Sequence, residues 1–279
     1  MSEFTDYFEK KIRQTIRKHK LFTHKDKIGV AVSGGKDSIT ALYVLKKLGY
    51  SVEALLIDVS IKEYSDNNLE KVKELCLRDE IPLHVLSFKE KFGKTLRSMR
   101  KILKDKGYNY SYCMLCGILK RYLMNQFARG NFEVLVTGHN LDDEAQAFIM
   151  NVFRNDFLLA ARQGPEPGII KQDGFVRRVK PLFYMQESET EKYSKIKKLP
   201  VNYSICPLSK GAFRRDFKEM LDGFEKNYPS VKYNIVRFQE RMKEHTVLPK
   251  YEIGSCEICG EPASKKICKT CQILQEIEK

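Results

Sequence analysis

Residues 28–38 read Ile-Gly-Val-Ala-Val-Ser-Gly-Gly-Lys-Asp-Ser, an apolar run that leads into a glycine pair, a lysine, a carboxylate and a hydroxyl. This order predicts a buried strand that turns sharply into a helix. The glycines let the backbone bend so that successive N–H groups converge on an anion, and the amino end of the following helix adds partial positive charge. Lys36 adds a full charge. The stretch therefore predicts a phosphate-binding loop, although its spacing is not that of a Walker motif.

Short apolar runs and helical patterns alternate along the rest of the chain. The expected strands are residues 27–33, 52–59, 82–88, 133–137 and 175–179. The expected helices are residues 4–20, 37–48, 66–78, 116–129, 186–198, 210–226 and 231–244. Such alternation predicts an α/β fold, a parallel sheet with helices on both faces, whose ligands bind at the carboxyl ends of the strands.

The charge balance indicates a polyanionic partner. The 279 residues, 42% of them hydrophobic, carry 50 Lys and Arg against 36 Asp and Glu, a formal net charge of +14. Residues 89–106 alone hold eight basic side chains against two acidic ones, so we expect nucleic acid as a partner, with a solvated helix face as the alternative. Apolar runs fall far short of the roughly 20 residues of a membrane span, and no signal-peptide pattern appears, so the expected location is cytoplasmic, away from membranes.

Three cysteines form a candidate reactive group. Cys113 and Cys116 are expected to open a helix, where thiols have lowered pKa values, and Cys206 follows the strand-like residues 201–205, which could bring it to the same site. Three thiols do not complete a structural zinc site, whereas a four-iron cluster on three thiolates keeps one iron open. The alternatives are a catalytic persulfide with a resolving cysteine, or two inert thiols. The single Cys76 fits a helix core.

The last four of the eight cysteines lie in the C-terminal tail. Two Cys-x-x-Cys pairs stand eight residues apart in a segment too short for its own apolar core, which favours a closed four-thiolate zinc site over a second cluster or a redox pair. The expected zinc ligands are Cys256, Cys259, Cys268 and Cys271.

The motif Ser-Gly-Gly-Lys-Asp-Ser at residues 33–38 resembles the PP-loop of the ATP pyrophosphatases, which adenylate a substrate and release pyrophosphate. The resemblance implies an adenine nucleotide α-hydrolase-like, Rossmann-like fold that binds ATP with Mg²⁺. Asp58, at the end of the second expected strand, is a weak candidate for the ribose. The expected nucleotide-binding residues are Val32, Ser33, Gly34, Gly35, Lys36, Asp37, Ser38, Asp58 and Gly138.

Four motifs in order narrow the resemblance. Together with the PP-loop, the Cys-x-x-Cys pair, residues 137–144 (Thr-Gly-His-Asn-Leu-Asp-Asp-Glu) and a lone later cysteine resemble the tRNA 2-thiolation group, TtuA and TtcA, over residues 8–251. The C-terminal knuckle is similar to that of TtuA and of the archaeal and eukaryotic wobble-uridine thiolases. The resemblance implies a [4Fe-4S] cluster on Cys113, Cys116 and Cys206.

The same resemblance implies the catalytic residues. They are Lys120, Asp142 in preference to Asp143, and Asp37. Without the motif, Lys120 would be interpreted as a surface lysine of a helix, and Asn140 or Asp142 would be interpreted as a helix N-cap. We do not expect His139 to be a base.

Taken together, the sequence predicts a tRNA uridine 2-sulfurtransferase that adenylates the C2 carbonyl oxygen and replaces it with sulfur. The expected partners are tRNA and a sulfur donor (sulfide, a persulfide or a ubiquitin-like thiocarboxylate carrier), and the resemblance implies a second copy of the chain as a further partner. The expected domains are a basic N-terminal helix (1–24), a catalytic domain (25–250) and a zinc tail (251–279). The alternatives are another PP-loop tRNA-modifying enzyme, such as a persulfide-type thiouridylase or a lysidine synthase, and a non-catalytic zinc-bearing RNA-binding protein.

Overall fold

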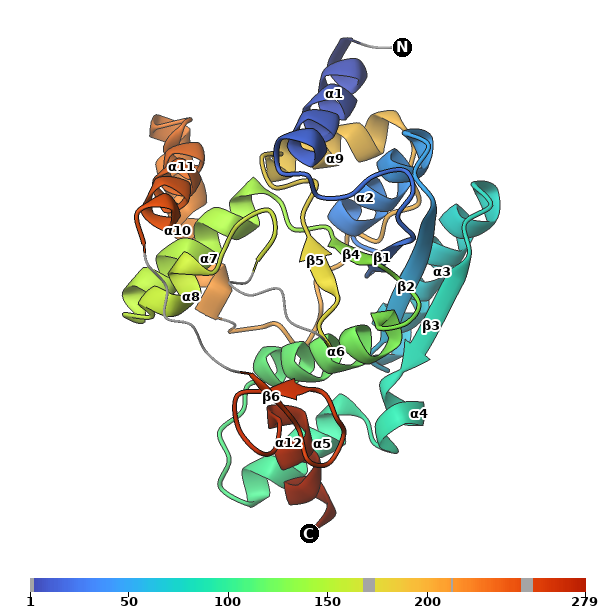
Figure 1. Ribbon diagram of the computed structural model, residues 1–279, viewed down its shortest axis with the longest axis vertical. Coiled ribbons are helices and arrows are strands. Elements are labelled where there is room, and N and C mark those ends of the chain that lie inside the picture. The colour runs from blue at the N-terminus through green and yellow to red at the C-terminus, as the bar shows by residue number, and fades with distance from the viewer. Residues whose placement is uncertain (1–2, 168–173, 212, 247–252) are drawn as a thin grey trace.

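A five-stranded parallel sheet forms the centre of the molecule. The computed structural model describes residues 3–167, 174–211, 213–246 and 253–279. The strand order is β3-β2-β1-β4-β5, and every neighbouring pair is parallel, which confirms the predicted fold class (Figure 1). The strands are β1 (Ile28–Val32), β2 (Val52–Asp58), β3 (Leu83–Ser87), β4 (Val134–Thr137) and β5 (Arg177–Val179).

Helices cover both faces of the sheet because successive strand side chains point to opposite faces and both sets are apolar. In β2, Ala54 and Leu56 join the core beneath one layer, and Leu55 and Ile57 join the core beneath the other. The first layer contains α1 (Glu3–Lys18), α2 (Lys36–Lys47), α3 (Lys62–Arg78) and α9 (Glu187–Ile196). The second contains α4 (Phe88–Phe92), α5 (Leu96–Asp105), α6 (Tyr112–Ala128) and α12 (Lys269–Glu278).

A third group of helices packs beside the sheet and has a small core of its own. It contains α7 (Leu141–Phe153), α8 (Phe157–Ala161), α10 (Phe213–Asn227) and α11 (Val231–Glu244), on the left of Figure 1. Leu141 and Ala145 of α7 meet Leu221 of α10 and Val236 of α11 in this core. The group brings residues far apart in the sequence to the carboxyl end of β4.

Two sequence-based expectations need correction or extension. Residues 201–205 form no strand, because they cross from α9 to α10 and pair with no neighbouring strand. The basic stretch 89–106 forms two helices, α4 and α5, that the periodicity did not resolve. In α5, Leu96, Met99 and Leu103 are buried while the basic side chains face outward, so the solvated helix face is present there.

The C-terminal tail forms a small compact unit below α6. Its strands β6 (Gly254–Ser255) and β7 (Pro262–Ala263) pair antiparallel, and α12 packs against α5 and α6. The expected domain limit between residues 250 and 251 lies outside the described residues. Among the residues that are described, no helix has the length and apolar character needed to cross a bilayer.

Candidate nucleotide and cysteine site

The phosphate-binding loop follows β1 and leads directly into α2, as the sequence predicts. Gly34 has a φ of +78°, and a Cβ there would lie 2.8 Å from the Cα of Asn68, so only glycine fits. The N–H of Ser33 donates to Ser38 Oγ at 3.0 Å, and that hydroxyl donates to the carbonyl of Gly35 at 3.1 Å. These bonds fix a tight turn at the amino end of α2.

Lys36 is held by two carboxylates. Its Nζ lies 3.0 Å from Asp37 Oδ2 and 2.7 Å from Glu187 Oε1, at the start of α9. Burial opposes ionisation of Glu187, but hydrogen bonds from Lys218 and Lys36 prevail and lower its pKa to about 2. Burial and the nearby Asp143 raise the pKa of Asp37 to about 6, against the effect of Lys36. Sequence reasoning missed Glu187, since nothing in its surroundings marks it as a partner of the loop.

Residues after β4 complete the loop's surroundings. A Cβ on Gly138 would lie 2.7 Å from the backbone N of Ser38, so β4 ends in direct contact with the start of α2. The side chain of Asn140 donates to Asp37 Oδ1 at 3.0 Å and also caps α7. Asn140 and Asp143 form a capping box, in which the side chain of each accepts the backbone N–H of the other. The carboxylate of Asp143 also accepts a hydrogen bond from Arg214 at 3.0 Å.

Asp142 is buried, with 4% of its surface exposed, and makes two firm contacts. Its Oδ1 lies 2.5 Å from Lys232 Nζ, and its Oδ2 accepts the N–H of Glu187 at 2.7 Å. Asp142 therefore joins α7 to α9 and α11. The catalytic role expected for it stays a prediction.

Asp58 and Lys120 face a common cavity. Ser33, Asp58, Tyr64, Asn68 and Lys120 all line a small opening at the carboxyl ends of β1 and β2. Asp58 Oδ1 also accepts the N–H of Ser60 at 2.7 Å, which fixes the turn after β2. The fold thus brings a helix lysine beside the loop that precedes α2.

Cys113, Cys116 and Cys206 come near one another from two segments. Burial raises the pKa of Cys116, as do Cys206 and Cys113, while Lys120 opposes the rise. Burial and Cys206 likewise raise the pKa of Cys113. The lowered thiol pKa values expected at this helix terminus are therefore wrong, because burial of the two thiols raises their pKa values. The segment of Cys206 is tied to the loop, since the N–H of Asn202 donates to the carbonyl of Gly34 at 2.9 Å.

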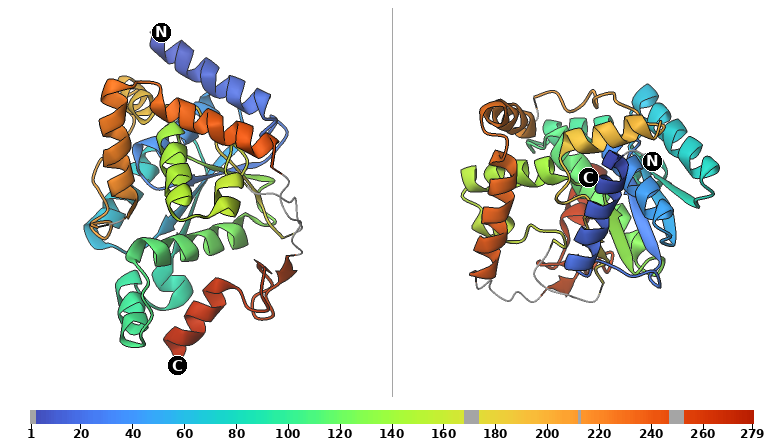
Figure 2. Two further views of the ribbon diagram at one scale, coloured as in Figure 1. Left: turned by 90° about the vertical axis from the view of Figure 1, so that its left-hand side faces the viewer. Right: turned by 90° about the horizontal axis from the view of Figure 1, so that it is seen from above.

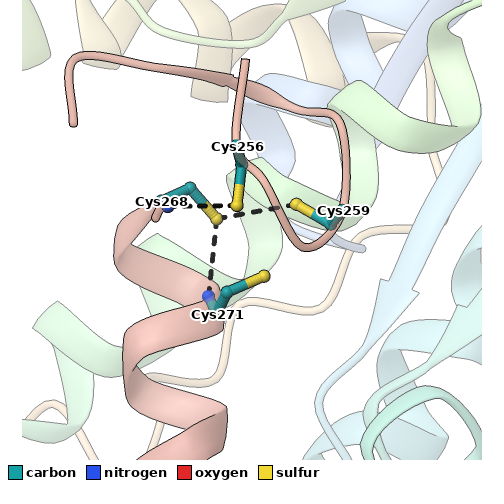
Figure 3. A group of neighbouring side chains, drawn as sticks. All are labelled: Cys256, Cys259, Cys268 and Cys271. Carbon is teal, nitrogen blue, oxygen red and sulfur yellow. Dashed lines mark hydrogen bonds between the residues drawn. The ribbon is translucent and has the colours of Figure 1, made fainter. Parts of the chain in front are cut away.

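The four tail cysteines converge (Figure 3). Their sulfurs all lie within 4.8 Å of one another, and the Sγ atoms of Cys259 and Cys268 are 3.7 Å apart. Four sulfurs placed tetrahedrally at 2.3 Å from a zinc ion are separated by about 3.8 Å. Burial opposes ionisation of Cys256, but backbone N–H groups from Cys268, Cys259 and Ile258 lower its pKa to about 6. The donor set fits a structural zinc ion.

Cationic side chains gather near the carboxyl ends of β4 and β5. The ring of His139 reaches solvent, yet burial together with Lys180, Arg214 and Arg178 lowers its pKa, against the effect of Asp143. Burial and the neighbouring Arg121 also lower the pKa of Arg178. Because these cationic groups make one another's charged forms less favourable, binding of an anion among them is favoured.

Comparison with known proteins identifies the class to which this fold and site belong. The PP-loop domain model matches residues 4–203. The tRNA-5-methyluridine(54) 2-sulfurtransferase of Pyrococcus horikoshii is 38% identical over 273 residues, covering 96% of this chain and 85% of that protein. The cytoplasmic tRNA 2-thiolation protein 1 of Arabidopsis thaliana is 32% identical, covering 99% and 78%.

A solved structure agrees with these relatives. The U34-tRNA thiolase NcsA from Methanococcus maripaludis, solved with its [4Fe-4S] cluster, superposes with a TM-score of 0.83 at 29% identity, covering 98% of this chain and 87% of that one. The chain belongs to the PP-loop family of tRNA 2-thiolation proteins.

Proposed function

We propose that this chain is an ATP-dependent tRNA sulfurtransferase that replaces the C2 oxygen of a uridine with sulfur. The observation that carries the proposal is the convergence of the phosphate-binding loop, Lys120 and the three cysteines at one edge of the sheet. The named relatives act in tRNA 2-thiolation, and their similarity extends over nearly the whole chain. The excess of basic residues suits a tRNA partner.

In the first step, the uridine O2 attacks the α-phosphorus of ATP and pyrophosphate leaves. The nucleotide-binding residues are Val32, Ser33, Gly34, Gly35, Lys36, Asp37, Ser38, Asp58 and Gly138. Backbone N–H groups of the loop and Lys36, with Mg²⁺, stabilise the charge that develops on the departing pyrophosphate. Lys120 lines the cavity beside Ser33 and neutralises charge at the phosphorus. We also assign catalytic roles to Asp37 and Asp142.

In the second step, a sulfur nucleophile attacks C2, and the oxygen leaves as part of AMP. Cys113, Cys116 and Cys206 would hold a [4Fe-4S] cluster, and their mutual influence within a half-buried site supports that fit. Such a cluster, held by three thiolates, supplies an open iron for binding the external sulfur.

The tail and the assembly complete the proposal. Cys256, Cys259, Cys268 and Cys271 would hold a Zn²⁺ ion that stabilises the C-terminal unit. The domains are the N-terminal helix (1–24), the catalytic domain (25–250) and the zinc tail (251–279). We propose a cytoplasmic homodimer that receives sulfur from sulfide, a persulfide or a thiocarboxylate carrier.

Anaerobic turnover tests the proposal. Protein reconstituted with iron and sulfide is incubated with ATP, sulfide and unmodified tRNA, and thiouridine, AMP and pyrophosphate are measured together. We expect the three products in equal amounts. Formation of ADP and orthophosphate without AMP would rule out the adenylation step.

Cys206→Ala is the matching variant, and Cys76→Ala is its control. Cys76 is buried in α3 within the core of the first helical layer, away from the three-cysteine group. We expect Cys206→Ala to abolish thiouridine formation and Cys76→Ala to retain most of it. Full activity of Cys206→Ala would exclude the three-thiolate site.

A further inference from the structure

A chain of ion pairs joins the loop lysine to helices that follow the PP-loop domain. One oxygen of Glu187 lies 2.7 Å from Lys36 Nζ, and its other oxygen pairs with Lys218 Nζ of α10. The backbone N–H of Glu187 donates to Asp142, which in turn pairs with Lys232 of α11. The PP-loop model ends at residue 203, so Lys218 and Lys232 lie beyond it.

The arrangement leaves the loop lysine fully neutralised. Asp37 and Glu187 both contact its ammonium group, whose side chain is only 15% exposed. A lysine that binds phosphate must exchange at least one of these carboxylates for phosphate oxygens. The exchange would leave a partly buried carboxylate unpaired, at a substantial cost in free energy, unless another cation remains on it.

Glu187 already has that second cation. If Lys36 moves to a phosphate, the contact of Lys218 with Glu187 can keep this carboxylate neutralised. Lys218 also pairs with Asp222, one helical turn away, at 3.4 Å, which keeps its amino group directed along α10.

The ion pair also flanks the segment that carries Cys206. Glu187 begins α9, Lys218 lies within α10, and residues 197–211 connect the two helices. Asn202 in that connection donates to the carbonyl of Gly34. Glu187 and Lys218 thus lie on the two helices that are joined by the segment presenting the third cysteine.

We propose that Glu187 is an exchangeable counter-ion of Lys36, and that Lys218 retains Glu187 while Lys36 transfers to the triphosphate of ATP. Both are positioning residues, since they act through Lys36. This inference rests on the proposed function only in taking ATP as the ligand of the loop. The proposal requires that substitutions of Glu187 and of Lys218 change the nucleotide affinity in opposite directions.

The test measures binding of the α,β-methylene analogue of ATP with Mg²⁺, which prevents cleavage between the α- and β-phosphates. We expect Glu187→Gln to lower the Kd several-fold, because Lys36 loses a competitor for phosphate. We expect Lys218→Met to raise the Kd several-fold, because Glu187 then holds Lys36 alone. Lys218→Arg, which keeps the cation, is expected to bind within about twofold of the unaltered protein.

The double variant separates this mechanism from a general effect of charge. If Lys218 acts through Glu187, Lys218→Met has little effect in a Glu187→Gln background, and the two single effects are not additive. The matched controls are Glu191→Gln, a partly exposed glutamate of α9 paired with Lys195, and Lys226→Met, an exposed lysine of α10. We expect neither control to alter the Kd.

The outcomes distinguish this inference from the proposed function. If the unaltered protein does not bind the analogue, ATP is not the ligand and the proposed function fails. Additive effects, or a higher Kd in both single variants, would overturn the exchange mechanism while leaving ATP binding intact. Thermal unfolding of each variant verifies that the compared proteins are folded.

Discussion

At the scale of single residues, Gly138 is where two segments of the site touch. A Cβ at this position would lie 2.7 Å from the backbone N and 2.8 Å from the Cα of Ser38. Backbone atoms at the start of α2 cannot yield as a flexible side chain would. We expect Gly138→Ala to displace the phosphate-binding loop and to weaken ATP binding at least tenfold, measured by titration with the methylene analogue.

Gly223→Ala is the control for that change. Gly223 lies within α10, and a Cβ there would meet nothing within 4 Å. Because alanine is favoured over glycine inside a helix by about 0.5–1 kcal/mol, this variant is expected to be slightly more stable and to bind normally. Equal losses in both variants would contradict a specific contact between Gly138 and the loop.

Glu187 also predicts a pH dependence of stability. Its pKa in the folded protein is about 2, below the ordinary value of 4.5, so its stabilising ion pairs are complete above pH 4.5 and are lost as the pH falls toward 2. Since the side chain is partly exposed, the contribution is at most about 3 kcal/mol. Between pH 5 and pH 3, we expect Glu187→Gln to lose less free energy of unfolding in urea than the unaltered protein. If Glu187→Gln loses as much free energy of unfolding over this pH range as the unaltered protein does, the assignment to Glu187 is wrong. It is also wrong if Glu191→Gln reduces the loss as much as Glu187→Gln does.

At the scale of helices and strands, Lys232 holds α11 in place. Its ammonium group is 2% exposed and lies 2.5 Å from Asp142, 2.5 Å from Asp222 and 2.7 Å from Glu225. These three carboxylates come close enough to hold a metal ion, but the lysine occupies the position between them. The cluster thus joins α7, α10 and α11 around one buried cation.

We expect Lys232→Met to lower the free energy of unfolding by about 3 kcal/mol, because it leaves the buried Asp142 without its cation. Chemical denaturation measures the change, with Lys226→Met as the exposed control. A stability unchanged by Lys232→Met would show that the cluster does not anchor α11.

The sequence predicted the sheet and most helices because its strands are buried on both faces and its helices are amphipathic. The expected helix at residues 231–244 has the same limits as α11, and the loop at residues 33–38 lies between β1 and α2 as expected. Residues 201–205 were wrongly expected to be strand-like because Val201 and Ile205 alternate with polar residues, although the segment pairs with no strand. Their course is set instead by long-range contacts such as that of Asn202 with Gly34.

The candidate site was predictable where motifs are contiguous and not where contacts join distant segments. Lys36 and Cys116 belong to short motifs, whereas Glu187, Lys218 and Lys232 stand in ordinary amphipathic helices. Their importance comes from the meeting of α9, α10 and α11 with α7, which no local spacing encodes. Local sequence does not encode the thiol pKa values either, since the burial of Cys116 depends on the packing of the whole second helical layer.

At the scale of the whole molecule, the basic surface has a definite position relative to the cysteines. In Figures 1 and 2, α5 and the tail with α12 lie on one side of the sheet, and α1 lies on the other. Arg100 of α5 donates to the carbonyl of Tyr110, two residues before α6, the helix that carries Cys113, begins at Tyr112. The basic face of α5 is therefore connected directly to the cysteine segment, and an RNA bound along it would extend toward the site.

This placement predicts which basic residues bind tRNA. Arg97, Lys101 and Lys104 share the exposed face of α5, opposite its buried leucines. Each phosphate contact releases counterions, so the logarithm of the binding constant falls with the logarithm of salt concentration by about 0.7–0.9 per contact. We expect neutralising all three residues to glutamine to weaken tRNA binding and to reduce this slope by about two, measured by filter binding at several salt concentrations.

The control for the basic face is a triple variant with the same charge change on the opposite side of the sheet. Lys10, Arg13 and Arg17 are exposed on α1, and changing them to glutamine also lowers the net charge by three. If α5 contacts the RNA backbone, its variant loses more affinity and more of the salt slope than the α1 variant does. Equal losses would mean that the net charge of +14 attracts tRNA without a preferred surface. A loss confined to the α1 variant would move the RNA to the face formed by the first helical layer, away from the tail.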